Sequence, residues 1–335
     1  MKKALIVLLL MAIVVAAIPA VVGAILANEL PDAARQQWPD ARVDWDGGWL
    51  RSRLRIDDPE LEVDATFHHL SISPAAWITF EGRAIPMEPA GVIDFSGFLG
   101  LAGRLTARAS APSLDVDDRA RWNWQGLTGE VDVARDGEAV GTLRADRLTI
   151  RDALGNQLQL AEIGLDLGWS QPGERTGRLD LDLSARRDAQ PSSRLAISAR
   201  EVTVAAAAEL GGALARLASA DPRTAGGGLD ALGAASAWQQ LVAGGLELRL
   251  ETLVLDEVVE ASGRWTPAAG PLRLDGRGAL PTLVDWWSTV LGLSAELRPR
   301  EARDQVRAAV ADLQAAGAMY VEGQRFEFRL PPPQP

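Results

Sequence analysis

The chain has 335 residues and a formal net charge of −11, with 47% hydrophobic and 24% charged residues. This composition is typical of a globular protein and excludes a disordered chain. The acidic balance argues against binding nucleic acid, which requires clustered Lys and Arg, and against lying flat on anionic lipid. The sequence contains no cysteine, which excludes disulfides, cysteine chemistry and a lipoprotein thiol.

The first strong signal is an uncharged stretch from Ala4 to Ala27. A helix of this length reaches about 36 Å at ~1.5 Å per residue, which exceeds the roughly 30 Å thickness of bilayer hydrocarbon. Residues 1–29 are therefore predicted to form an N-terminal transmembrane anchor. The residues assigned to this anchor are Lys2, Lys3, Leu8, Val14 and Pro19.

The flanking charges predict the orientation of this anchor. Lysines precede the span, and the acidic residues Glu29 and Asp32 follow it, which places the N-terminus in the cytoplasm. A cleaved signal peptide is the alternative, with cleavage near Ala20, Ala24 or Ala27. Arg replaces Lys throughout the rest of the chain, and Ala and Gly are abundant. These features favour a bacterial, single-pass inner-membrane protein whose bulk lies in the periplasm.

From about Val43 onward, apolar and polar residues alternate with period two, as in half-buried strands. Leu179 to Ala185 is the clearest example, with Asp180, Asp182 and Ser184 between apolar residues. Short turn signals such as Asp-Gly and Asp-Asp-Pro separate the alternating runs, which predicts an antiparallel meander. Such a sheet must cover its apolar face by curling, by packing on a second sheet, by taking on helices, or by holding another molecule.

Helical periodicity appears in the second half of the chain, near 201–243, 281–293 and 300–316. Residues 319–330 are predicted to form a hairpin, and 331–335 a disordered tail. No linker divides residues 30–330, which are interpreted as a single periplasmic β-rich domain. The predicted fold class is mainly β (α+β): a long curved antiparallel meander sheet, with covering helices in its second half and one transmembrane helix before it.

The residue types that usually carry chemistry do not form a site. His68 and His69 are the two histidines of the sequence, and neighbours in a strand point to opposite faces, which argues against a shared metal. Asp44 and Asp46 suggest a calcium loop, but Arg42 and Arg53 occupy positions that require acids. We therefore expect no catalytic, cofactor-binding or metal-binding residue, and no enzymatic activity.

Tryptophan is frequent, with eleven residues in the chain. Trp45 and Trp49 fit either a membrane interface or packing on a strand face. Trp286 and Trp287 are adjacent on a predicted helix whose apolar stripe includes Trp287, so Trp286 is expected to face away. This pair is the candidate contact with a partner or a lipid.

The segment from Trp45 to Ser52 resembles the opening of the YdgA-like family of bacterial proteins. The residues that fit its short motif are Gly48, Trp49 and Ser52. More broadly, the anchor followed by alternating strands resembles AsmA-like envelope proteins, in which a membrane anchor holds a β-rich periplasmic groove. The resemblance implies a role in envelope integrity or lipid handling, and it transfers no functional residue.

These observations together predict a non-enzymatic, membrane-anchored periplasmic protein of the cell envelope. Its apolar concave sheet face is expected to accommodate lipid acyl chains or a hydrophobic partner segment. The alternative is a protein–protein scaffold or assembly factor with a closed core. The expected partners are the inner membrane, through the N-terminal helix, and a lipid or an envelope protein, without nucleic acid and without a cofactor.

Overall fold

The computed structural model describes residues 41–47, 51–59, 61–68, 76, 78–87, 89–100, 102–117, 120–171, 175–187, 190–219, 225–268 and 270–330. These residues contain seventeen strands and four helices. None of these helices is both long enough and apolar enough to cross a membrane. The predicted anchor, with Lys2, Lys3, Leu8, Val14 and Pro19, lies outside the described residues.

The chain divides into two compact units. Unit 1 comprises residues 1–118 and 122–146, and unit 2 comprises residues 119–121 and 147–335. The main division falls inside one strand, β9 (Ala139–Asp152). A boundary within a regular strand leaves no composition change or Pro-rich linker for the sequence to reveal.

Unit 1 is an antiparallel meander. Its strands are β1 (Arg42–Gly47), β2 (Arg51–Asp58), β3 (Leu61–His68), β4 (Ile78–Pro86), β5 (Ala90–Gly91), β6 (Ile93–Leu99), β7 (Leu105–Asp117), most of β8 (Ala120–Val133) and the first part of β9. Neighbouring strands pair in the order β1, β2, β3, β4, β6 and β7, while the short β5 pairs with β7.

The alternation in the sequence defines two faces in unit 1. On β2, Leu54 and Ile56 are buried, whereas Arg53 and Arg55, which alternate with them, point to the other face. Together with Ala65 of β3 they form a buried cluster, against which Trp45 and Phe67 pack. The rings of Trp45 and Phe67 lie 5.9 Å apart, so Trp45 is engaged in strand-face packing.

Unit 2 continues with antiparallel strands and contains all four described helices. Its strands are β10 (Gln157–Ser170), β11 (Thr176–Arg187), β12 (Ser192–Thr203), β13 (Glu247–Leu255), β14 (Val259–Trp265), β15 (Arg273–Ala279), β16 (Met319–Glu322) and β17 (Arg325–Leu330). Its helices are α3 (Val204–Ser219), α4 (Ala225–Ala243), α5 (Leu280–Ala295) and α6 (Pro299–Ala315). The strands pair in sequence from β10 to β15, and β17 then pairs with both β15 and β16.

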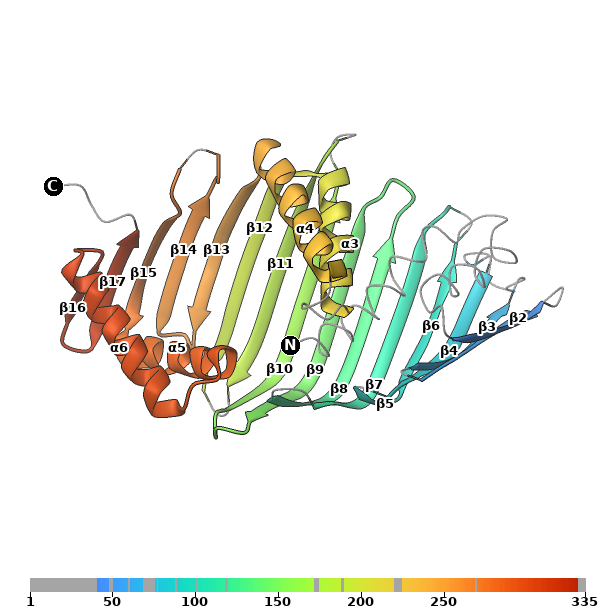
Figure 1. The fold of residues 1–335 in the computed structure, drawn as a ribbon, viewed down its shortest axis with the longest axis horizontal. Helices are drawn as coiled ribbons and strands as arrows, with labels where there is room; N and C mark the ends of the chain where they lie inside the picture. Colours follow the sequence, from blue (N-terminus) through green and yellow to red (C-terminus); the bar gives the residue numbers. More distant parts are fainter. Residues whose placement is uncertain are drawn as a thin grey trace. The chain divides into compact units, whose positions relative to one another are not determined.

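The helices form two hairpins that connect strands of the sheet. The α3–α4 hairpin connects β12 to β13, and the α5–α6 hairpin connects β15 to β16. Because antiparallel strands alternate in direction, β12 and β15 end at opposite ends of the sheet. Within unit 2, α3–α4 and α5–α6 accordingly lie on the same face, toward opposite ends of the strands (Figure 1).

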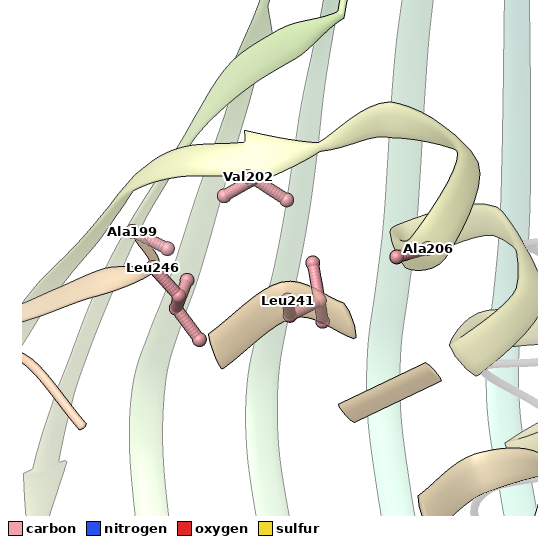
Figure 2. Packing of buried hydrophobic residues seen from close by; sticks show 5 residues of the cluster. All are labelled: Ala199, Val202, Ala206, Leu241 and Leu246. Carbon is pink, nitrogen blue, oxygen red and sulfur yellow. The ribbon is translucent and has the colours of Figure 1, made fainter. Parts of the chain in front are cut away.

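The α3–α4 hairpin is held at its base by a small apolar cluster. Ala199 and Val202 of β12 pack with Ala206, Leu241 and Leu246 (Figure 2). Helix α4 ends in a Schellman motif, in which the Leu246 N–H donates to the carbonyl of Leu241. Gly245 supplies the left-handed conformation that this motif requires, with φ of 90°.

The α5–α6 hairpin packs more extensively on the sheet. Val306 and Val310 of α6 are buried against Val259, Met319 and Phe326. Leu283, Val284 and Leu291 of α5 pack against the same cluster, which also contacts Leu255, Leu280, Leu313, Val321 and Phe328. The apolar stripe of α6 therefore provides the main cover over the last strands of unit 2.

The structure confirms the mainly β fold, the antiparallel meander and the helices in the second half of the chain. The hairpin predicted at 319–330 is also present as β16 and β17. The helical segment predicted near 201–243 begins slightly later, at Val204, because β12 continues to Thr203. Glu201 itself has a positive φ of 53°, which is incompatible with a right-handed helical turn.

Candidate functional site

Strand register in unit 2 arranges apolar side chains into rows that cross the strands. One row joins Leu165, Leu183, Leu195 and Leu253, and the next joins Leu167, Leu181, Ile197 and Leu250. Residues two apart on a strand share a face, and an irregularity between Leu250 and Leu253 of β13 keeps these two residues on the same face although they are three apart. Both rows therefore lie on one side of β10 to β13. We call these eight residues the aliphatic strip.

The aliphatic strip is incompletely covered. Leu167 is 37% exposed, and the other seven residues are half-buried. In the neighbouring row on the α3–α4 side, Leu179 is likewise exposed, at 39%, but other parts of the apolar face are buried by the helical hairpins. Toward one end of the strands, Ala199 is buried with the base of α3–α4. Toward the other end, Val259 is buried under α5–α6. The strip is thus the part of the apolar face that lies between the cover of the two hairpins.

The opposite face of unit 2 carries ion pairs between strands. Arg194 pairs with Asp182, Arg277 with Glu260, and Arg329 with Asp275. The hydrogen bonds from Arg194 hold the pKa of Asp182 below its usual range. One face of the sheet is therefore adapted to water, while the other presents aliphatic side chains.

Unit 1 contains a hollow of about 1130 Å³ on its polar face. Its lining includes five arginines and five acidic residues, so their formal charges cancel: Arg51, Arg53, Arg83, Arg108, Arg144, Glu62, Asp64, Glu81, Asp94 and Glu130. Several of these charges are already paired across strands, such as Arg83 with Asp94 at 2.9 Å and Arg108 with Glu130 at 3.0 Å. The hollow therefore resembles a solvated, charge-compensated sheet face.

A buried polar network lies beside the aliphatic strip at the α5 side of unit 2. The carboxylate of Asp256 accepts hydrogen bonds from Arg187 at 3.1 Å, Trp286 at 3.0 Å and Ser193 at 3.2 Å. The Arg187 guanidinium also donates to Asp285 at 2.7 Å and lies 4.6 Å from the Trp286 ring centroid. This network ties α5 to the ends of β11, β12 and β13.

The two adjacent tryptophans of α5 are oriented differently from the sequence expectation. Trp286 was expected to face away from the sheet, but its indole N–H is bonded to Asp256. Trp287 is expected on the packed stripe, yet it is 36% exposed, and Val290 on the same side of the helix is 50% exposed. Val284 and Leu291 instead pack on the apolar cluster, and Ser288 and Gly292 are buried, with Gly292 against Asn156. The packed face is therefore rotated around the helix. A lipid or partner contact at Trp287 stays a prediction.

The residues of the short family-like motif are only partly described. Gly48 and Trp49 lie outside the described residues, whereas Ser52 is 2% exposed on the apolar face of β2. His68 lies on the polar face, 3.8 Å from Glu81, and His69 lies outside the described residues. Within the part of the chain that the structure describes, no three His, Asp or Glu side chains are grouped to hold a metal ion.

Sequence reasoning identified the alternating strands that supply the strip, but not the rows. It also missed Arg187 and Asp256, because an Arg and an Asp separated by so many residues give no local signal of pairing. No protein-family model, curated protein or solved structure matches this chain. The resemblance to YdgA-like proteins stays a prediction.

Proposed function

We propose that this chain is a non-enzymatic, membrane-anchored protein of the bacterial periplasm whose aliphatic strip accommodates lipid acyl chains. The observation that carries the proposal is the pair of aliphatic rows left between two helical hairpins. The uncharged stretch from Ala4 to Ala27 supports a membrane location near such lipids.

The chemistry of the strip favours an acyl chain over a peptide. All eight side chains are aliphatic, whereas protein interfaces are enriched in aromatic residues and Arg. The backbones of β11 and β12 are paired with strands on both sides. An extended peptide lying over the strip would therefore leave its own N–H and C=O groups without partners there, which is costly away from water. A methylene chain has no such groups.

The energetic gain also suits a lipid chain. Complete burial of a Leu or Ile side chain contributes about 1.5–3 kcal/mol relative to full exposure. The seven half-buried side chains and the exposed Leu167 therefore retain apolar surface, and covering it with a bound chain would contribute several kcal/mol. A water-soluble ligand rich in hydroxyl groups would find no hydrogen-bonding partners among these residues.

The proposal is tested by extracting the full-length protein in a mild detergent and measuring co-purifying lipid by mass spectrometry. We expect lipid with the wild type, and a severalfold loss with Leu253→Asn, which places an amide in the strip. Thr252→Asn is the matched control, because Thr252 is the neighbouring residue on β13 and faces the other side of the sheet.

Lipid that is absent from the wild type, or equally abundant in both variants, would overturn the proposal. An envelope protein crosslinked at Leu253 in place of lipid would support the scaffold alternative.

A further inference from the structure

The two rows of the aliphatic strip change character beyond β13. The first row continues at Ala261 of β14 and Gly276 of β15, and the second continues at Gly263 of β14. A Cβ atom on Gly276 would collide with the ring of Phe328, and one on Gly263 would lie 2.7 Å from the side chain of Leu274. Phe328 and Leu274 therefore fill the space above these glycines.

These two side chains come from the strands beyond the strip. Phe328 on β17 lies opposite Gly276 on β15, and Leu274 on β15 lies opposite Gly263 on β14. Each side chain thus extends back across its neighbouring strand, toward the strip. Beyond β13, the rows of leucine and isoleucine end, and Leu274 and Phe328 cover the same face of the sheet from strands farther along it.

Phe328 is fixed in this position by the packing of the α5–α6 hairpin. Its ring stacks on Phe326, with centroids 6.0 Å apart and planes 13° from parallel. Phe326 is 1% exposed and belongs to the cluster formed with Val306 and Val310 of α6, against which Phe328 packs. Displacing the ring would require disturbing the main apolar core of this hairpin.

We propose that Leu274 over β14 and Phe328 over β15 form a stop that ends the two rows of the aliphatic strip and so limits the length of acyl chain that it holds. This inference rests on the function proposed above and adds its chain-length specificity. From β10, the row that Leu274 ends at β14 crosses four strand spacings, about 19 Å at ~4.8 Å each, and the row that Phe328 ends at β15 crosses five, about 24 Å. Chains longer than these distances would leave methylenes in water or bend away from the sheet.

The test uses the full-length protein in detergent and a series of saturated fatty acids from decanoate to docosanoate. Their affinities are measured by displacement of a fluorescent fatty acid. With the wild type, affinity should rise with chain length and then stop rising. Phe328→Ala and Leu274→Ala should each move this limit to longer chains, by a length comparable to one strand spacing of ~4.8 Å.

Phe80→Ala is the matched control, because Phe80 covers Gly97 in unit 1 in the same way, and it should leave the limit unchanged. Leu274→Ala keeps the test decisive if Phe328→Ala does not fold, since Leu274 is half-buried. If the chain-length limit is unchanged in Leu274→Ala, the proposal of a stop is overturned. The proposed function still holds in that case, provided that the protein binds the fatty acids. Wild-type protein that binds none of the fatty acids contradicts the proposed function as well.

Discussion

Asp256 is a buried carboxylate in the described part of unit 2. Its side chain is 5% exposed and pairs with Arg187, which is 15% exposed. Removing one partner of a buried ion pair leaves the other charge uncompensated. The pair therefore makes each member hard to replace, whatever its net contribution to stability.

Asp256→Asn should lower the free energy of unfolding by about 2 kcal/mol, because Arg187 loses its buried anionic partner and keeps only the more exposed Asp285. Asn tolerates the positive φ of 49° at this position, so the change isolates the charge. Urea unfolding followed by tryptophan fluorescence measures the effect. Glu257→Gln is the control, because Glu257 is exposed in the same turn with a φ of 57°. Equal effects of the two changes would contradict the role of the buried pair.

The paired carboxylates of the polar face make stability depend on pH. Arginine hydrogen bonds hold the pKa values of Asp64, Asp132, Asp182 and Glu247 below their usual range. Groups whose pKa is lower in the folded state stabilise it above their unfolded pKa, and this contribution is lost as the pH falls through the folded pKa.

The urea midpoint should therefore stay nearly constant from neutral pH to about pH 5 and fall steeply below about pH 4, the ordinary carboxyl range. In Asp182→Asn this fall should be smaller, because one of the responsible groups is absent. A midpoint that rises on acidification below pH 4, or an identical profile for the variant, would refute this account. Unfolding curves at a series of pH values measure it.

At the scale of elements, glycine has opposite roles in the two helices of the α3–α4 hairpin. Gly245 ends α4 with a φ of 90°, whereas Gly211 lies inside α3. A Cβ atom at either position would meet no atom within 4 Å. Substitution by Ala therefore changes backbone preference alone at both sites.

Gly245→Ala should destabilise the protein by about 1 kcal/mol, because a left-handed conformation is unfavourable for Ala. Gly211→Ala should stabilise it by up to about 1 kcal/mol, because Ala favours the helix. Thermal and urea unfolding of the two variants compare the effects directly. Destabilisation by both substitutions would show that contacts beyond the backbone decide the outcome.

The position of each helical hairpin on the sheet is also decided at the scale of elements. Each hairpin follows directly from a strand, so the direction of that strand decides which end of the sheet it covers. Three strands, β13 to β15, separate the two hairpins along the chain. The second hairpin therefore begins at the opposite end of the sheet from the first. With an even number of strands between them, both hairpins would lie at the same end of the sheet. The uncovered part of the apolar face would then lie elsewhere.

At the scale of the whole molecule, the sequence predicts an outward-facing body attached to the inner membrane. Alkaline phosphatase fused after Pro335 should be active in bacterial cells, and a cytoplasmic fluorescent reporter at the same site should stay dark. Replacing Lys2 and Lys3 with Glu should reduce the phosphatase signal, because these are the cations before the span. The opposite reporter pattern would contradict the orientation and the periplasmic location together.

The alternation of apolar and polar residues was enough to predict the strands, their antiparallel order and the existence of an apolar face, because side-chain direction in a strand has a fixed period of two. The helical period of about 3.6 residues predicted the locations of the helices to within a few residues. The tertiary structure alone decided which side chains became neighbours across strands, since register depends on turns and bulges far from each pair. It likewise decided that Arg187 meets Asp256, that Trp286 faces inward, and that Phe328 lies over Gly276. These contacts join residues distant in the chain, and no local pattern encodes their distance in space.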